Sequence, residues 1–163
     1  MGRLVVLGLG DLLSQDKGLG IYAVRDLYQD DWPQEVDFLH SMQKKPGEFE
    51  LDGCEHLLVL DAWSTGQAPG TMHRCTMQEL IRDRQALQAS HIWEALTLAQ
   101  LMGQSIDVLL MGLEPERTEW NLQLSPALQR AYPHFLSQVR QKMRELLQEM
   151  GVNAGDLPVA YAV

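Results

Sequence analysis

Residues 4–20 read LVVLGLGDLLSQDKGLG. A run of branched apolar residues comes first, two glycines break it, and acidic and polar residues follow before a new apolar period begins. This order is typical of a buried strand, a tight loop and the start of a helix. In an open α/β sheet, ligands bind just beyond the carboxyl ends of the strands. We therefore expect the functional chemistry to lie around residues 8–20.

The two glycines do not complete a nucleotide-binding motif. Gly8-x-Gly10 lacks the third glycine of a dinucleotide fingerprint, and no Gly-Lys-Ser/Thr follows it. Asp11 and Asp16 would also repel a phosphate. The carboxylates favour a metal or a peptide, while glycines that merely turn the chain remain an alternative. A nucleotide-binding α/β enzyme stays a minor hypothesis, which nucleotide binding to the Gly8 loop would support.

Composition narrows the class of protein. The 163 residues fit one domain, 1–163, and 45% hydrophobic with 21% charged residues is ordinary for a soluble globular protein. The net charge of −9 argues against nucleic acid or an anionic membrane as partner and favours a cation or a basic peptide. The N-terminus does not read as a signal peptide, and no apolar run approaches the ~20 residues that span a bilayer. We expect a cytoplasmic monomer.

Apolar periodicity and turn residues predict alternating strands and helices along the chain. Strands are expected at 4–7, 36–40, 56–63, 71–75 and 106–111, and helices at 17–28, 77–87, 90–102 and 126–150. Ser125 is expected to cap the last helix, and Pro133 to kink it or divide it in two. This alternation predicts an α/β fold, a three-layer sandwich with a largely parallel twisted sheet flanked by helices.

Three acidic or imidazole features are expected at the carboxyl edge of this sheet. They are the loop with Asp11 and Asp16, Asp61 at the end of an apolar strand, and His91 in the first turn of a helix. A helix N-terminus keeps an imidazole neutral and available as a ligand or base. Two oxygen donors and one imidazole suit a divalent transition metal. His91 as a cap or surface residue, and Asp61 as a helix cap or ion-pair partner, remain alternatives.

Six segments follow one another in an order that no single motif would specify. They are residues 4–20, Leu58-Val59-Leu60-Asp61-Ala62, Ala68-Pro69-Gly70-Thr71, Ser90-His91, Gly112-Leu113-Glu114-Pro115-Glu116, and Leu124-Ser125-Pro126-Ala127 continuing to Tyr132-Pro133. Together they resemble the hydrogenase maturation protease family over nearly the whole chain. Members of that family trim the C-terminal extension from the large subunit of nickel-iron hydrogenase after nickel has been inserted.

The resemblance implies an endopeptidase whose partner is a hydrogenase large-subunit precursor. The nickel would belong to the substrate, so no permanent cofactor is expected. The family's nickel-contacting residues are a glutamate in the first loop, an aspartate that ends the central strand, and a histidine. The last two fall on Asp61 and His91, but the first falls on Lys17. An ammonium has no lone pair for a metal and repels it.

Two hypotheses account for Lys17. In the first, Asp11 or Asp16 supplies the missing carboxylate and Lys17 pairs with the other. In the second, the chain is a non-catalytic maturation or peptide-binding factor of the same fold. We favour the first because Asp11 adds a carboxylate where Lys17 removes one. The predicted site therefore has Asp61 and Asp16 as catalytic residues, and Asp61, His91 and Asp11 as nickel contacts.

Overall fold

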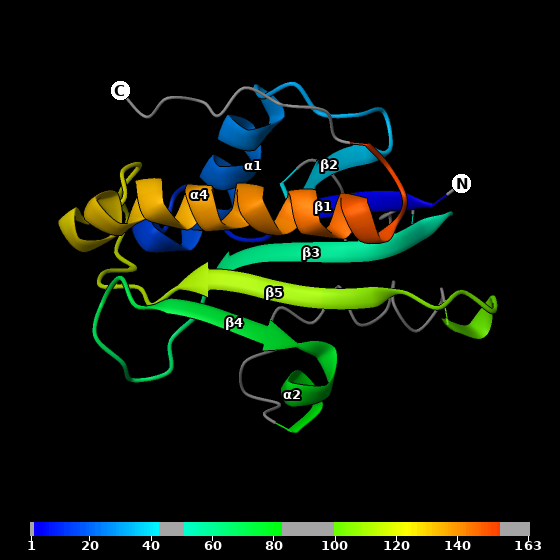
Figure 1. Ribbon diagram of the computed structural model, residues 1–163. Coiled ribbons are helices and arrows are strands. Elements are labelled where there is room, and N and C mark those ends of the chain that lie inside the picture. Colours follow the sequence, from blue (N-terminus) through cyan, green and yellow to red (C-terminus); the bar gives the residue numbers. More distant parts are fainter. Residues whose placement is uncertain (1, 43–50, 83–99, 154–163) are drawn as a thin grey trace.

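The structure is a computed structural model that describes residues 2–42, 51–82 and 100–153. Its centre is a five-stranded sheet with the strand order β2-β1-β3-β5-β4 (Figure 1). The strands are β1 (Arg3–Gly8), β2 (Val36–His40), β3 (Cys54–Ala62), β4 (Met72–Thr76) and β5 (Asp107–Leu113). Among these five described strands, only β4 runs antiparallel to its neighbour, β5. The predicted α/β fold with a largely parallel sheet is confirmed.

The helices follow the predicted alternation with shifted boundaries. Those in the described residues are the 3-10 helix η1 (Gln15–Gly18), α1 (Leu19–Tyr28), α2 (Met77–Arg82) and α4 (Pro126–Glu149). A 3-10 turn thus replaces the predicted start of the first helix. The predicted helix at 77–87 is seen up to Arg82, and most of the one at 90–102 lies outside the described residues. None of the helices in the described ranges is long and apolar enough to cross a membrane.

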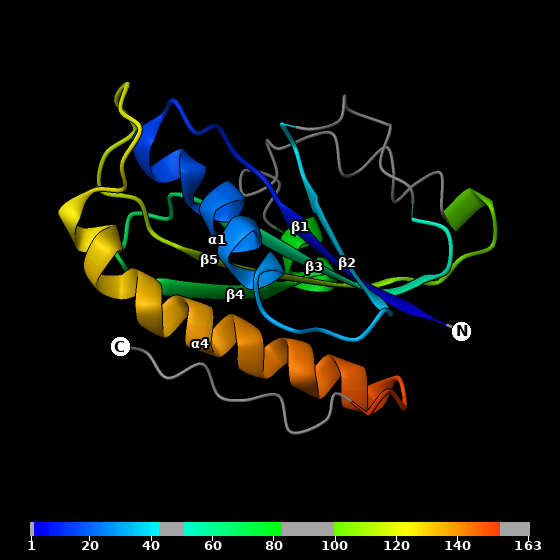
Figure 2. The ribbon, with the colours of Figure 1, turned by 90° about the horizontal axis from the view of Figure 1, so that it is seen from above.

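Helices α1 and α4 cover one face of the sheet, as Figure 2 shows from above. Leu58 and Leu60 of β3 point to that face and pack with Leu27 of α1 and Phe135 of α4. The alternate residues of β1 and β3 point to the opposite face and form a second buried cluster. Strands covered on both faces need apolar residues throughout, which explains the continuous apolar runs in the sequence.

Helix α4 is continuous through Pro133, so the predicted division into two helices is wrong. Proline removes one helical hydrogen bond and costs about 3 kcal/mol in a helix interior. Pro133 itself is exposed, whereas Phe135, Val139 and Met143 are fully buried on the side facing the sheet. Packing along this buried side outweighs the local cost because it extends on the same helix for several turns beyond Pro133.

Gly20 sets how closely α1 approaches the sheet. A Cβ at this position would lie 2.2 Å from the carbonyl oxygen of Leu60 and 2.4 Å from that of Leu9. Only glycine permits this contact. The first turn of α1 therefore sits directly on β3, and the loop that precedes α1 is held beside the end of that strand.

Candidate active site

The carboxyl ends of the parallel strands gather at one edge of the sheet. Gly8 of β1 pairs in register with His40 of β2 and with Leu60 of β3, and Asp61 pairs with Gly112 of β5. The segments that follow these strands therefore meet at the same edge. This is the position where open α/β sheets bind their ligands.

Asp61 lies at this edge, one residue before the end of the central strand β3. Its side chain is half-buried, and its Oδ1 accepts a hydrogen bond of 2.8 Å from the amide of Ala62. Burial raises the pKa of Asp61 to about 7, although the Ala62 amide and the charge of Lys17 both act to lower it. A carboxyl group with this pKa exchanges its proton near neutral pH, as a general acid or base requires.

The loop after β1 folds back so that its two ends meet beside Asp61. The Asp11 amide donates to the carbonyl oxygen of Lys17 at 3.0 Å. Gly10 has a φ of 137°, and a Cβ there would lie 1.8 Å from the Lys17 carbonyl oxygen and 3.9 Å from Oδ1 of Asp61. Glycine is thus required both by the backbone angle and by the contact. The fold places Lys17, whose side chain is exposed, close enough to act on the charge of Asp61.

Asp11 is exposed and engaged within its own loop. Its Oδ1 accepts from the amide of Leu13 at 2.9 Å, and its Oδ2 accepts from the hydroxyl of Ser14 at 3.1 Å. These contacts are those of a turn stabilised by an aspartate. Both hydrogen bonds are open to solvent, so a ligand could exchange for them. The role of Asp11 as a nickel contact stays a prediction.

Asp16 is fully buried and has four hydrogen-bond donors. Oδ2 accepts from the amides of Glu116 and Arg117 and from the hydroxyl of Ser125, each at 2.8 Å, and Oδ1 accepts from the Ser125 amide at 2.7 Å. A buried carboxylate needs such partners. Asp16 thus ties the loop after β5 and the start of α4 to the loop after β1. Its catalytic role stays a prediction, and this geometry gives it no support.

The start of α4 differs from the prediction in one detail. Ser125 occupies the N-cap position but makes no side-chain cap, because its hydroxyl donates to Asp16 instead. The carboxylate of Glu116 accepts from the Ala127 amide at 3.1 Å. Glu116 thereby satisfies one of the amides that a helix start leaves free.

A buried pair, Glu114 and His73, lies at the same edge and escaped the sequence analysis. His73 Nε2 is 3.0 Å from Glu114 Oε2, and the two side chains are 8% and 4% exposed. Glu114 also accepts from the amides of Thr65 at 2.9 Å and Gln67 at 2.8 Å, and the ring of Trp63 lies over His73 at 5.0 Å. Burial acts to raise the pKa of Glu114, but these donors together hold it below its ordinary value. Glu114 therefore fixes the loop that follows Asp61.

His40 is a second imidazole at the edge that the sequence analysis did not single out. It ends β2 opposite Gly8, and its Nδ1 is buried without a hydrogen-bond partner among the described residues. Burial lowers the pKa of His40, which favours the neutral ring. The position of His40 at the end of a predicted strand could have marked it as a candidate site residue. The sequence of β2 predicts an edge strand, however, and a histidine on an edge strand needs no functional explanation.

Comparison with known proteins establishes the family of this chain. The model of the HycI hydrogenase maturation protease family matches residues 36–142, about two thirds of the chain. The chain belongs to the hydrogenase maturation protease family. The resemblance seen in the sequence is confirmed.

Individual relatives agree with this assignment. The chain is 31% identical over 121 residues to the hydrogenase expression/formation protein HupD of Thiocapsa roseopersicina, covering 69% of this chain and 54% of HupD, so the alignment spans about half of that relative. It is 26% identical to HoxM of Cupriavidus necator over 91% of this chain and 75% of HoxM. The structure superposes on the hydrogenase maturating endopeptidase HybD from E. coli with a TM-score of 0.72 and 27% identity, covering 88% of this chain and 93% of HybD.

Only part of the predicted set of nickel contacts lies within the described residues. Asp61 as a nickel contact and Lys17 at the position of the family's glutamate stay predictions, and the structure brings Lys17 close enough for its charge to act on Asp61. His91 lies outside the described residues. Across residues 2–42, 51–82 and 100–153, no three His, Cys, Asp or Glu side chains gather closely enough to hold a metal ion. The described part of the edge therefore offers Asp61 to a metal, with an ammonium as its neighbour.

Proposed function

We propose that this maturation protease is the endopeptidase that removes the C-terminal extension of a nickel-loaded hydrogenase large-subunit precursor. One observation carries the proposal: Asp61 lies one residue before the end of the central strand, at the ligand-binding edge, with a pKa of about 7. Family membership supplies the reaction class. The nickel is part of the substrate, so the enzyme itself needs no resident metal in this proposal.

Asp61 can act on the substrate in two ways that its geometry supports. As a carboxylate it offers an oxygen to the nickel of the precursor, together with the imidazole of His91. With a pKa near neutral it can also take a proton from a water that attacks the scissile amide, and the leaving amine needs a proton in return. The loop fixed by Glu114 follows Asp61 directly and would line the path of the extension.

Lys17 shapes this chemistry through its charge. An ammonium near Asp61 favours the ionised carboxylate, which is the form that binds a metal. The same ammonium repels the metal itself. In the proposal, Asp11 offsets this repulsion with a second carboxylate in the same loop. Its turn contacts are solvent-exposed and can be exchanged for a ligand.

The alternative function is a non-catalytic maturation factor that holds the precursor without cutting it. The observation that favours it is that the carboxylate of Asp16 already accepts four hydrogen bonds from other segments. Of the two predicted catalytic carboxylates, both within the described residues, this leaves Asp61 as the one without such structural contacts. If Lys17 also prevents contact with the nickel, the protein would still bind the precursor but would not cleave it.

Mass spectrometry of the precursor separates the two functions. Nickel-loaded and nickel-free precursor are each incubated with the protein, and the intact masses are recorded. Loss of the C-terminal extension in the nickel-loaded sample alone is the expected result. An uncut precursor that co-purifies with the protein would overturn the endopeptidase and support the maturation factor. Asp11→Asn should weaken binding of the nickel-loaded precursor about as much as Asp61→Asn does, and an unchanged affinity would refute compensation by Asp11.

A further inference from the structure

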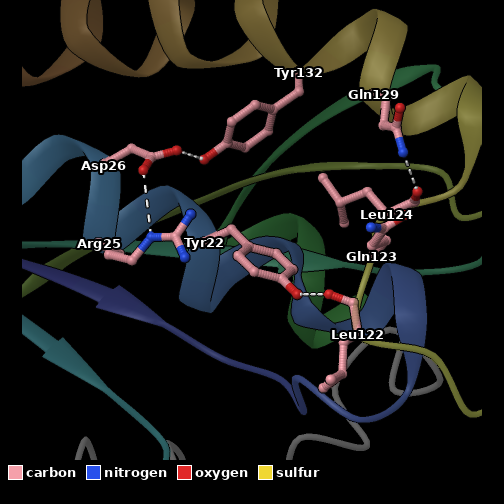
Figure 3. Close-up of a pocket in the computed structure, with 8 residues that line it drawn as sticks. All are labelled: Tyr22, Arg25, Asp26, Leu122, Gln123, Leu124, Gln129 and Tyr132. Carbon is pink, nitrogen blue, oxygen red and sulfur yellow. Dashed lines mark hydrogen bonds and ion pairs between the residues drawn. The ribbon is translucent and has the colours of Figure 1, made fainter.

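A hollow of about 250 Å³ lies between α1, the segment 122–124 and the first turns of α4, shown in Figure 3. Its volume is below the ~300 Å³ at which small-molecule sites begin. It can therefore accept one large side chain, but it is too small for a cofactor.

Two tyrosines are held in place on the walls of the hollow. The hydroxyl of Tyr22 donates to the carbonyl oxygen of Leu122, and that of Tyr132 donates to Asp26 at 2.5 Å (Figure 3). Because both hydroxyls have partners, the two rings are fixed before anything binds. A binding partner would lose little entropy in ordering them. Together with Leu122 and Leu124, the rings give the hollow an apolar lining.

Arg25 places a positive charge at the rim. Its guanidinium lies 5.1 Å from the centre of the Tyr22 ring, and the side chain is 63% exposed. Only its Nε contacts Asp26, at 3.4 Å, so in the part of the chain that the structure describes its terminal nitrogens remain available. An exposed guanidinium beside an apolar hollow is complementary to a carboxylate that stands next to an apolar side chain.

Exposed apolar side chains extend this surface toward the candidate active site. Leu122 is 59% exposed, Trp120 80% and Leu13 45%. Their segments are joined, because the amide of Asn121 donates to the carbonyl oxygen of Leu13 at 3.0 Å. Leu13 belongs to the loop that carries Lys17 to Asp61. Contiguous exposed apolar groups mark interaction sites in soluble proteins.

We propose that this surface docks the body of the hydrogenase large-subunit precursor, which inserts one large apolar or aromatic side chain between Tyr22 and Tyr132 and sets a neighbouring carboxylate on Arg25. The inference rests on the proposed function and adds to it a contact outside the cutting site. A second copy of this chain is a poorer occupant because two chains of charge −9 repel each other. The surface would hold the precursor while Asp61 meets its C-terminal segment.

Leu122→Asp tests the docking surface, with Leu101→Asp as the matched control. Leu101 is 80% exposed. Its segment leads into the amino end of β5, away from the carboxyl edge of the sheet (Figure 1). Affinity for nickel-loaded precursor is measured by biolayer interferometry, cutting by mass spectrometry, and folding by circular dichroism. Leu122→Asp should weaken binding about tenfold or more, as loss of a central apolar contact does, with the cutting rate at saturating precursor unchanged. Arg25→Gln should weaken binding in the same way.

The outcomes distinguish docking from cutting. Equal affinity in the two leucine variants would overturn the docking surface and leave the endopeptidase standing. Weakened binding by Leu122→Asp, in a protein that never cuts, would support docking and overturn the endopeptidase. No binding of the precursor by the wild-type chain would overturn both. A concentration-dependent dimer that Leu122→Asp dissolves would overturn the precursor as occupant in favour of a second copy.

Discussion

Replacing Asp16 by alanine should destabilise the protein severely, because four donors lose their acceptor at once. A hydrogen bond to a charged group contributes about 1.5–3 kcal/mol. The amides of Glu116 and Arg117 belong to exposed residues and can be rehydrated, whereas Ser125 is fully buried and loses two bonds. Counting only the two Ser125 bonds in full gives a loss of about 3–6 kcal/mol in the free energy of unfolding.

Two variants make this magnitude specific. Asp16→Asn can still offer one oxygen to the three donors that meet at Oδ2, so its cost should be about 1–2 kcal/mol. Asp11→Ala removes an exposed turn contact and should cost under about 1 kcal/mol. Urea unfolding followed by tryptophan fluorescence measures all three. An Asp16→Ala variant within about 1 kcal/mol of wild type would refute the assignment of Asp16 as the tie between these loops.

Three further predictions concern the same edge. Because burial raises the pKa of Asp61 from 3.8 to about 7, the folded wild type holds an extra proton between these pH values and loses stability as the pH rises through them. Asp61→Asn should lack this loss and be more stable than the wild type at pH 8 by up to about 4 kcal/mol in thermal denaturation, and equal pH slopes would contradict it. Lys17→Met should raise the pKa of Asp61 further, since it removes a nearby positive charge, as a carboxyl titration by NMR would show and an unchanged pKa would refute. Glu114→Gln should loosen the loop that contains Thr65 and Gln67, so a nonspecific protease should cleave this loop faster in limited proteolysis. A cleavage rate equal to that of the wild type would show that Glu114 does not hold the loop in place.

The positions of the strands along the chain could be predicted because burial leaves a direct trace in the sequence. The run from Leu57 to Leu60 has no polar alternation, and the structure covers it on both faces. The loop between Gly8 and Gly20 could be placed at the carboxyl edge for the same reason, since a parallel strand fixes where its following loop lies. Helix ends were less certain, and η1 replaced the expected first turn of α1.

The contacts across the site could not be predicted because they join residues far apart in the chain. Asp16 meets donors that lie 100 to 109 residues away, and Glu114 meets Thr65 across 49. An aspartate in a glycine loop reads the same in the sequence whether it binds a metal or ties two loops together. The signal for Glu114 was present, since an acidic residue directly after a buried strand needs partners. The continuity of α4 through Pro133 could not be predicted either, because the expectation that a proline breaks a helix takes no account of tertiary packing.

The proposed cutting of the precursor takes place at the edge formed around Asp61. Its most direct test is the intact mass of nickel-loaded large-subunit precursor after parallel incubation with the wild-type protein and with Asp61→Asn, both verified as folded by circular dichroism. We expect loss of the C-terminal extension with the wild type and a full-length precursor with the variant. Cutting by Asp61→Asn at the wild-type rate would contradict it.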